Sequence, residues 1–415
     1  MSTAQPPTTA IIGAGISGLS LALALNQQSI PCTVYESRSA PLNIGGAITL
    51  FPNGLRVLDA LGIYSVIKPQ GYSFDALYFR DAAGNLTETH EFGSEAKYGY
   101  SALRVYRHVL INALLAALKD RGVRVEYGRK FSHVITDDEG ITFAFTDGSQ
   151  EPAAILVGAD GIHSTVRKVL YPDLGPPSFV GQIAMSAAVP TAQLNLPAGA
   201  DLREHLPATF VSQQHGAFVM APQGPDGSEV IIAKQKRVPV DPRREGLAAM
   251  LANKEAHIAL LRENADAFPD IVKNAVSDIP IDQLFVWPFY VVPRLERWAS
   301  WEKGRGRVVI VGDAAHAIPP SSGQGVNQAL EDVYMLSLLL GNKGVDEAEP
   351  LGFWQKYRQA RVDRILKLVE QIDLRRLPTD EVEEKVVKEP FELGWLYGTD
   401  LRGDVDAWVR DNAKE

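Results

Sequence analysis

The sequence predicts an α/β protein with two interleaved lobes, one built on a parallel sheet and one on a mostly antiparallel sheet, followed by a C-terminal helical segment. Short apolar runs that end in glycine or acidic turns, each followed by helical periodicity, indicate the parallel sheet. This rhythm is absent between residues 178 and 286, where short strands punctuated by glycine and proline indicate the antiparallel sheet. A charged amphipathic pattern from Phe353 to Arg375 indicates a long helix after both lobes.

The composition is that of a globular protein, because 46% of the 415 residues are hydrophobic and 22% are charged. The net charge of −9, without a basic stripe, argues against a nucleic-acid partner. The single cysteine, Cys32, excludes an internal disulfide and a cysteine metal cluster, and no metal site is predicted. No stretch predicts a membrane span, and residues 10–25 lack the basic flank of a signal peptide. We therefore expect a cytoplasmic protein.

The first element is a strand, a glycine turn and a helix near the N-terminus. Residues 10–12 read as a strand that leads into the Gly13-x-Gly15-x-x-Gly18 turn, and Glu36 ends the next strand, eighteen residues beyond Gly18. The glycines permit a tight turn and the close approach of a pyrophosphate to the helix N-terminus, and Glu36 would accept ribose hydroxyl protons. The pattern predicts a dinucleotide site. Because an acid at Glu36 would repel a 2′-phosphate, the site should hold FAD or NAD.

A second strand, turn and helix lies much later in the chain. Residues 308–311 form an apolar, β-branched run typical of a strand buried on both faces of a sheet. Asp313 follows directly, at the carboxyl end of the strand, where open α/β sheets bind ligands. The next helix begins at Gly325, and its first turn leaves the backbone N–H groups of Gly325, Val326 and Asn327 unpaired. An anion or the electron-rich edge of a flat, reducible ring would fit there.

A third strand, at residues 155–158, ends close to Asp160. Asp160 is expected to cap the helix that follows, and capping alone is enough to explain it. Arg107 is expected in the first turn of another helix, where a cation gains nothing from the helix dipole. That mismatch favours an external anion beside Arg107, although a surface arginine is the alternative.

The segment from Gly312 to Asn327 resembles the second FAD motif of the class A flavoprotein monooxygenases, the p-hydroxybenzoate hydroxylase and salicylate hydroxylase type. The turn at residues 13–18 and the Asp160-Gly161 pair are similar to the other two FAD fingerprints of that family. The resemblance covers nearly the whole chain and implies an FAD/NAD(P)-binding Rossmann-like lobe interleaved with a substrate lobe. The residues that carry the second motif are Gly312-Asp313-Ala314-Ala315-His316, Pro320, Gly323-Gln324-Gly325 and Asn327.

The resemblance also implies roles for single residues. Asp313 would meet the ribityl chain of a non-covalently bound FAD, and the helix start at Gly325 would face the pyrimidine end of the isoalloxazine. Arg107 would contact the FAD, while Gly46 and Ala47 would pass beside the flavin ring. The expected cofactor-binding residues are Gly13, Gly15, Gly18, Glu36, Gly46, Ala47, Arg107, Asp160, Asp313, Gly325, Val326 and Asn327.

The activity that the resemblance implies is an FAD-dependent monooxygenation. With NADH or NADPH as transient cosubstrate and O2 as oxidant, such an enzyme hydroxylates or epoxidises an organic small molecule through a C4a-hydroperoxyflavin. Two alternatives stay open: a flavin-dependent halogenase, whose usual Trp-x-Trp-x-Ile-Pro motif does not occur here, and a non-catalytic binding protein of the Rab-escort or GDP-dissociation-inhibitor kind. The sequence predicts neither the catalytic base nor the oligomeric state.

The expected substrate lobe departs from the family pattern at two positions. Many phenol hydroxylases of the family carry a Tyr-Arg pair shortly before a Val-Pro, and the arginine position is Ser186 here. A later tyrosine that precedes a proline is replaced by Ala221. Together with Met220, these residues predict a roomy, weakly polar pocket for a bulky aromatic, polyketide-like or alkaloid-like substrate. A phenolate in a dry pocket of this kind would lack its charged partners.

The base, if one is needed, would have to come from elsewhere, and His215 and Tyr290 are the candidates. Ser186 and Ala221 are expected to face the open side of the flavin, with no arginine in the same cavity. An arginine such as Arg104 or Arg203 pointing there would instead favour a phenol hydroxylase.

These assignments divide the chain into interleaved parts. A hairpin signal at residues 81–85 opens the second sheet, and Trp287-Pro288 is expected to lead back to the first lobe. The expected FAD-binding lobe comprises residues 1–72, 101–177 and 287–345, the substrate lobe comprises 73–100 and 178–286, and the C-terminal helix and tail comprise 346–415.

Overall fold

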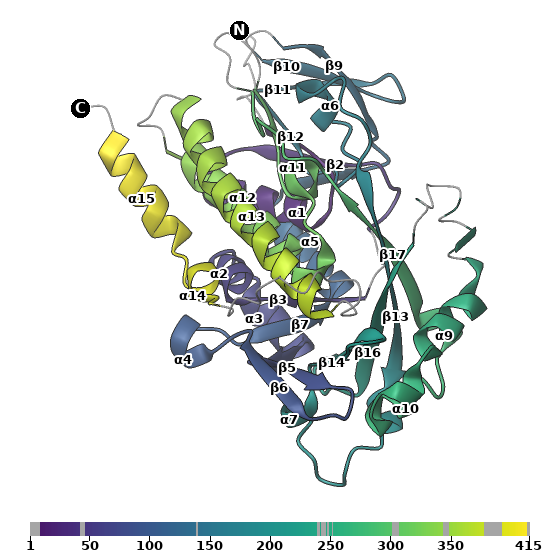
Figure 1. The fold of residues 1–415 in the computed structure, drawn as a ribbon. Helices are drawn as coiled ribbons and strands as arrows, with labels where there is room; N and C mark the ends of the chain where they lie inside the picture. The colour runs from purple at the N-terminus through teal and green to yellow at the C-terminus, as the bar shows by residue number, and fades with distance from the viewer. Residues whose placement is uncertain are drawn as a thin grey trace, which may run out of the picture.

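The computed structural model describes residues 9–41, 46–137, 140–238, 241, 246, 249–250, 252–300, 307–342, 348–376 and 392–412. Figure 1 shows a parallel sheet covered by helices, a second large sheet beside it, and C-terminal helices that lie along one side of the first lobe. The predicted α/β class and the two interleaved lobes with a C-terminal helical segment are confirmed.

A five-stranded sheet in the order β18-β12-β1-β2-β8 forms the centre of the first lobe. All adjacent strands are parallel, and Gly158 pairs with both Ile12 and Ile310. The turns that follow β1, β12 and β18 therefore meet at one edge of the sheet, where parallel α/β proteins bind ligands. The strands are β1 Thr9–Ile12, β2 Cys32–Glu36, β8 Arg124–Tyr127, β12 Ile155–Gly158 and β18 Arg307–Ile310.

Helix α12 (Gly325–Leu340) is the central helix of this lobe, and it packs against α1, α2, α13 and α15. The structure buries this helix on nearly all sides, its polar residues included. Its polar face is buried because α13 supplies charged partners for it. The helices around it are α1 Ile16–Gln27, α2 Pro52–Ala60, α5 Arg107–Asp120, α13 Ala348–Arg376 and α15 Leu401–Asn412.

The second lobe is built on a seven-stranded sheet in the order β17-β13-β16-β15-β14-β5-β6. Every adjacent pair is antiparallel except β14 with β5, as the sequence predicted for a mostly antiparallel sheet. Helices α9 (Lys254–Arg262) and α10 (Asp270–Ala275) cover one face. The strands are β5 Ala76–Asp81, β6 Leu86–Glu91, β13 Ser178–Pro190, β14 Ala208–Ser212, β15 Gly216–Gln223, β16 Glu229–Arg237 and β17 Leu284–Val291.

The second lobe differs from the sequence prediction at its C-terminal boundary. The expected boundary between residues 286 and 287 falls inside β17, which continues to Val291 and pairs with β13. Pro288 is compatible with this position because β17 is an edge strand, whose outer N–H groups need no partner. The sequence pattern of residues 243–267 also predicts a helix pair for this lobe, and part of that range lies outside the described residues.

Smaller elements connect the two lobes. A three-stranded sheet in the order β3-β7-β4 lies between them, and a separate β11-β10-β9 meander extends the first lobe. The strands are β3 Ala47–Leu50, β4 Tyr72–Phe74, β7 Ala102–Tyr106, β9 Phe131–Thr136, β10 Ile141–Phe145 and β11 Gln150–Ala153. The short helices are α3 Tyr64–Ile67, α4 Glu95–Tyr98, α6 Arg167–Leu170, α7 Leu202–His205, α11 Asp313–His316 and α14 Gly394–Tyr397.

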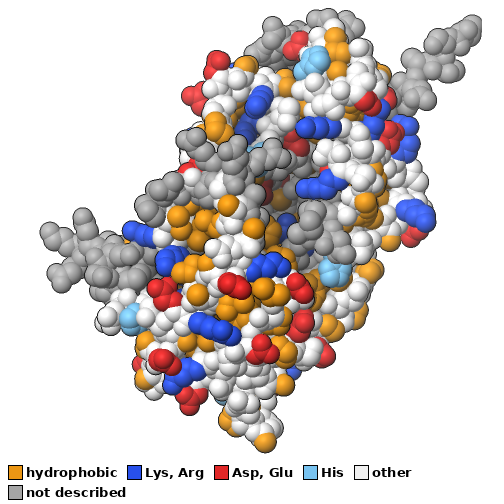
Figure 2. Space-filling model, turned by 90° about the vertical axis from the view of Figure 1, so that its right-hand side faces the viewer, with side chains coloured by type: hydrophobic (Ala, Val, Ile, Leu, Met, Phe, Trp, Pro, Cys, Tyr) orange, Lys and Arg blue, Asp and Glu red, His pale blue; other side chains and the backbone are white. Residues whose placement is uncertain are grey.

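Each lobe has its own hydrophobic core, which agrees with two separately packed units. On the face drawn in Figure 2, acidic and basic side chains are interspersed, and hydrophobic side chains gather in the lower half. Among the helices of the described residues, none has the length and hydropathy needed to cross a bilayer.

Candidate functional site

The turn between β1 and α1 combines close packing with an open helix start. Gly13 has φ +110°, and a Cβ at Gly18 would lie 1.9 Å from the Gly13 carbonyl oxygen. No side chain fits at either position. A Cβ at Gly15, by contrast, would meet nothing within 4 Å. The N-terminus of α1 is therefore free of side chains on the side where a pyrophosphate would approach.

Glu36 lies beside this turn, at the end of β2. It is 5% exposed, and its Oε2 accepts a hydrogen bond of 2.9 Å from the Ala14 backbone N–H. Its Oε1 accepts from the Arg38 backbone N–H at 2.9 Å. A carboxylate oxygen has two lone pairs, so Oε2 retains an acceptor site for a hydroxyl donor. The structure thus fixes the predicted ribose-binding carboxylate next to the glycine turn.

Asp313 begins α11, directly after β18 and Gly312. Its side chain is accessible to solvent, yet burial among protein atoms raises its pKa, while His316 and Arg107 act to lower it. A carboxylate that is both accessible and surrounded by protein lines an internal space rather than the outer surface. It stands where the resemblance places the ligand of the ribityl chain.

Arg107 is the first residue of α5, at the helix end where a cation is disfavoured. Its Nε is buried without a hydrogen-bond partner. Burial lowers the pKa of Arg107, and the nearby charge of Asp313 acts in the opposite direction. The guanidinium therefore lies near Asp313, and its Nε can still donate a hydrogen bond. A buried donor without a partner is typical of a ligand-binding residue.

Asp160 follows β12 and holds the next turn. Its Oδ2 accepts hydrogen bonds from the backbone N–H groups of Thr165 at 2.7 Å and Val166 at 3.2 Å. Its Oδ1 is buried without a partner. Burial raises the pKa of Asp160, against the lowering effect of these hydrogen bonds. Capping accounts for one oxygen and leaves the other available to a ligand.

The start of α12 offers backbone donors. Gln328 is the first residue whose N–H bonds along the helix, to the carbonyl of Gln324, so the N–H groups of Gly325 and Val326 are left over. The side chain of Asn327 is fully used: it accepts from the Phe51 N–H at 2.9 Å and donates to the Thr49 carbonyl at 3.1 Å. Asn327 thus ties α12 to β3 and contributes to a ligand site only through its backbone.

Gly46 and Ala47 lie at the start of β3, beside the second lobe. A Cβ at Gly46 would come within 3.9 Å of Ile231 Cδ1 and 4.0 Å of Gln223 Oε1. The segment that begins β3 therefore meets the seven-stranded sheet at Gly46.

These observations fit an extended dinucleotide. The turns after β1, β12 and β18 meet at one edge of the parallel sheet. The unused hydrogen-bonding groups are at the open start of α1, on Glu36, on Arg107 and Asp160, and at the N–H groups that begin α12. Each has hydrogen-bonding capacity that the protein leaves unused, and buried polar groups of that kind are uncommon without a ligand.

The start of α12 can be tested by substitution. A Cβ at Gly325 would meet nothing within 4 Å, so Gly325→Val is expected to fold normally. It should block access to the helix N–H groups and thereby either lower the flavin reduction potential or empty the site. Gly352→Val, at a glycine of α13 that is equally free of contacts, is the matched control. An unchanged potential with full FAD content in Gly325→Val would contradict this role.

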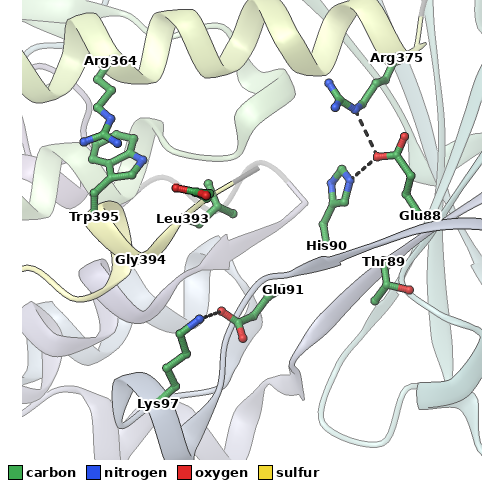
Figure 3. Close-up of a pocket in the computed structure, with 11 residues that line it drawn as sticks. Glu88, Thr89, His90, Glu91, Lys97, Arg364, Arg375, Leu393, Gly394 and Trp395 are labelled. Carbon is green, nitrogen blue, oxygen red and sulfur yellow. Dashed lines mark hydrogen bonds and ion pairs between the residues drawn. The ribbon is translucent and has the colours of Figure 1, made fainter. Parts of the chain in front are cut away.

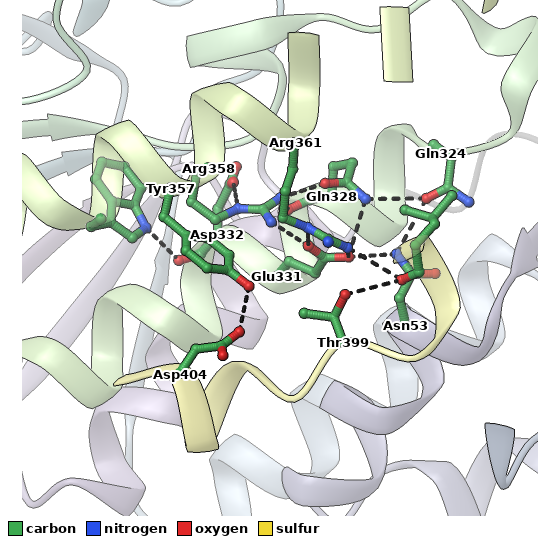
Figure 4. Close-up of polar contacts among 12 residues, drawn as sticks. Asn53, Gln324, Gln328, Glu331, Asp332, Tyr357, Arg358, Arg361, Thr399 and Asp404 are labelled. Carbon is green, nitrogen blue, oxygen red and sulfur yellow. Dashed lines mark hydrogen bonds and ion pairs between the residues drawn. The ribbon is translucent and has the colours of Figure 1, made fainter. Parts of the chain in front are cut away.

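Helices α12 and α13 share a buried network of charged side chains that the sequence analysis did not predict (Figure 4). Arg358 donates to Glu331, and through Nε to Asp332 Oδ1 at 2.8 Å. Arg361 binds both oxygens of Glu331, at 2.7 and 2.9 Å. Asn53 of α2 donates to Glu331 Oε1 at 2.6 Å. The sequence signal that could have predicted this network is the pair of adjacent acids, Glu331 and Asp332, in the otherwise largely apolar sequence of α12.

The network reaches the cofactor motif through Asp332. Asp332 Oδ2 accepts from the Gly312 backbone N–H at 3.0 Å and lies 2.5 Å from His316 Nε2. The turn that presents Asp313 is therefore held from behind by a carboxylate, which is itself paired with Arg358. His316 of the Gly-Asp-Ala-Ala-His run thus has a positioning partner.

The face of the seven-stranded sheet opposite α9 and α10 carries small side chains. Ser186 pairs with Ala233, and Ala233 pairs with Val219, so these three share a row. The next row is Ala188, Ile231 and Ala221. Because Ile231 reaches toward Gly46, this face lies next to the segment that begins β3. Ser186 and Ala221 therefore lie on the same face of the sheet.

The remaining candidate substrate residues are not brought together there. Met220 is fully buried in the core on the opposite face. His215 lies in the turn between β14 and β15, roughly 25 Å along β15 from Gln223 at a rise of about 3.3 Å per residue. Tyr290 of β17 donates to Asp241 at 2.9 Å. Strand alternation explains the position of Met220, since neighbouring residues point to opposite faces.

An arginine does lie beside this face, contrary to expectation. Arg104 of β7 donates through Nη2 to Gln223 Oε1 at 3.4 Å, and Gln223 also adjoins Gly46. The sequence names Arg104 only as the less favoured outcome, because the residues before Arg107 lead into a helix and predict no separate strand, whereas Ala102–Tyr106 forms β7. Arg203, the other arginine considered, is exposed in α7, 5.8 Å from the ring centroid of Tyr72.

A separate recess of about 770 Å³ lies between β6, the end of α13 and α14 (Figure 3). Glu88 bridges His90 and Arg375 across it, at 2.8 and 3.3 Å, and Lys97 pairs with Glu91 at 2.9 Å. None of the expected cofactor residues lines this recess. Its charges join the C-terminal helices to the edge of the second lobe.

Comparison with known proteins agrees with this geometry. The family described as "FAD binding domain" matches residues 7–371. The chain is 30% identical to a 3-amino-4-hydroxybenzoate 2-monooxygenase of Streptomyces platensis, over 86% of each chain, and 28% identical to a salicylate hydroxylase of Pseudomonas putida, over 95% of this chain and 93% of that one. Among solved structures, Klebsiella pneumoniae HpxO complexed with FAD and uric acid shares the fold, with a TM-score of 0.75, 23% identity, and 97% and 95% of the chains covered.

Proposed function

Because the chain belongs to the FAD-binding-domain family that includes the class A FAD-dependent monooxygenases, we propose that it oxygenates a small organic molecule with O2 and NADH or NADPH. The overall reaction consumes substrate, O2, reduced nicotinamide and a proton, and it releases oxygenated product, oxidised nicotinamide and water. The observation that carries the proposal is the meeting of three sequence-distant FAD segments, after β1, β12 and β18, at one sheet edge.

Bound FAD supplies the redox chemistry, since it accepts electrons from the nicotinamide and delivers them to O2. The residues of the chain hold and polarise it. Glu36, held by the Ala14 N–H, would bind the adenosine ribose, and Asp313 would bind a hydroxyl of the ribityl chain. The N–H groups at Gly325 and Val326 are oriented to stabilise negative charge on the ring.

The face of the second sheet opposite its helices supports a bulky, ring-shaped substrate. Side chains as small as Ala188, Ala221 and Ser186 line it, so large groups have room beside Gly46. The names of the relatives specify aminohydroxybenzoate and salicylate as their substrates, which supports an aromatic ring for this protein too. We infer hydroxylation or epoxidation of such a ring or of a conjugated alkene.

A substrate screen tests this proposal. The purified protein, expected to be yellow with bound FAD, is mixed with NADH or NADPH and a panel of aromatic and polyketide-type compounds. We expect a compound that accelerates nicotinamide oxidation and gains one oxygen atom from labelled O2, as read by mass spectrometry. Nicotinamide oxidation that no compound accelerates, with hydrogen peroxide as the sole product, would argue for an oxidase instead.

A further inference from the structure

We propose that Arg104 is an anion-binding residue of the substrate site, which holds a negatively charged oxygen, a carboxylate or a phenolate, on an aromatic substrate. The proposal rests on the proposed function and names the substrate chemistry for the same site. The expectation of a neutral substrate is thereby replaced by that of an anionic one. Its binding partner lies on β7, a strand outside the seven-stranded sheet.

The guanidinium of Arg104 is poorly satisfied by the protein. Its Nη1 donates to Thr49 Oγ1 at 3.2 Å and its Nη2 to Gln223 Oε1 at 3.4 Å, and both acceptors are neutral. Its Nε is buried without a partner. In the described part of the chain, no Asp or Glu forms an ion pair with Arg104. A buried cation in this state is costly unless an anion joins it.

The neighbouring groups do not neutralise this charge. Glu229, the carboxylate of the same cluster, accepts the phenolic hydrogen of Tyr106. Gln223 Nε2 donates to the Tyr106 oxygen at 3.2 Å, which turns Gln223 Oε1 toward Arg104. The chain of hydrogen bonds therefore fixes the guanidinium and leaves its charge unmatched. Burial lowers the pKa of Arg104 to about 10, so the side chain remains a cation near neutral pH.

The position of Arg104 points to a substrate rather than to the adenosine half of FAD. Gln223 Oε1 lies 4.0 Å from the Cβ position at Gly46, and Ile231 of the small-residue face lies 3.9 Å from it. Arg104 is partly accessible although protein surrounds it, so it borders the internal space between the lobes. An anion bound there would place its ring against Ala221 and Ala188, beside the flavin.

The test is a binding measurement on the oxidised, FAD-loaded protein, without nicotinamide. Three probes of one shape are compared: 2-naphthoate, 2-naphthol and the neutral 2-naphthamide. Dissociation constants are read from the perturbation of flavin absorbance, at neutral and at alkaline pH. We expect the naphthoate, or the naphthol once it ionises, to bind at least about tenfold more tightly than the amide, as a charge-assisted hydrogen bond allows.

Arg104→Gln should abolish this preference, weakening the anion roughly ten- to a hundredfold and the amide less than about twofold. Arg104→Lys should retain part of it, and Arg203→Gln, at an exposed arginine, should retain all of it. FAD content of each variant reports correct folding. Tighter binding of the naphthoate would show that the site takes a carboxylate. Tighter binding of the naphthol at alkaline pH would show that it takes a phenolate.

The proposal is overturned if the parent protein shows no preference for an anion, including the case in which no probe binds. It is also overturned if Arg104→Gln keeps the preference, or changes only the affinity for FAD. Because no turnover is needed, these outcomes are independent of the proposed function. A protein that prefers anions through Arg104 but oxygenates nothing would refute the monooxygenase and leave the anion site standing.

Discussion

Replacing Arg358 with leucine is expected to lower the free energy of unfolding by about 3–5 kcal/mol. The substitution leaves two fully buried carboxylates, Glu331 and Asp332, without their shared cation. Arg361 still pairs with Glu331, but Asp332 keeps only His316 and the Gly312 N–H. The thermal unfolding midpoint and the temperature of FAD release should both fall, because Asp332 holds the turn that carries Asp313.

The matched control is Arg364→Leu on the same helix. Arg364 is exposed and stacks over Trp395 with its guanidinium 4.0 Å from the ring centroid, so its loss should cost less than about 1 kcal/mol. Equal midpoints for the two variants would show that the buried pair contributes no net stability.

The loss caused by Arg358→Leu should depend on pH in a defined direction. Burial would raise the pKa of Glu331 and of Asp332, but in the parent the nearby cations outweigh it and lower both. Carboxylates with depressed pKa values stabilise the fold above their unfolded pKa of about 4, and this stability is lost as the pH falls through their folded values. The gap between parent and variant should therefore be widest near neutral pH and close in acid.

Asp313→Ala is expected to weaken FAD binding by about 1.5–3 kcal/mol, or roughly ten- to a hundredfold in Kd, because it removes a charge-assisted hydrogen bond. It also leaves the buried guanidinium of Arg107 without its charge neighbour. The affinity is measured by titrating apoprotein with FAD and following flavin fluorescence. Asp313→Asn, which keeps an acceptor oxygen, should lose less. If Asp313→Ala binds FAD as tightly as the parent, Asp313 is not a flavin ligand.

The strand, turn and helix segments expected to hold the cofactor could be predicted from the sequence because their signals are local. A strand, a turn that requires glycine, and a helix start occur within a few residues of one another, and their geometry follows from backbone sterics. Gly13, Gly18 and Asp313 could thus be placed before the fold was known. The parallel pairing of β1, β12 and β18 then brings the segments together.

The substrate half was not readable in the same way. Arg104 acts across lobes, on Gln223, which lies 119 residues later in the chain, and no periodicity reports such a contact. Strand β7 was not predicted because its five residues, Ala102–Tyr106, lead directly into a helix whose apolar pattern is the stronger signal. Met220 and Ala221 were grouped as neighbours in sequence, although strand alternation sends them to opposite faces.

The order of strands in the first sheet bears on how the protein is made. β18, which completes the ligand edge, begins about 300 residues after β1, and the whole second lobe is synthesised between them. Contacts between residues so far apart in the sequence form late, because closing the intervening loop costs chain entropy before the new contacts stabilise the structure. On the ribosome, α1 emerges long before α12, its main packing partner. Capture of FAD therefore belongs to the last stage of folding, and the second lobe can collapse around its own core beforehand.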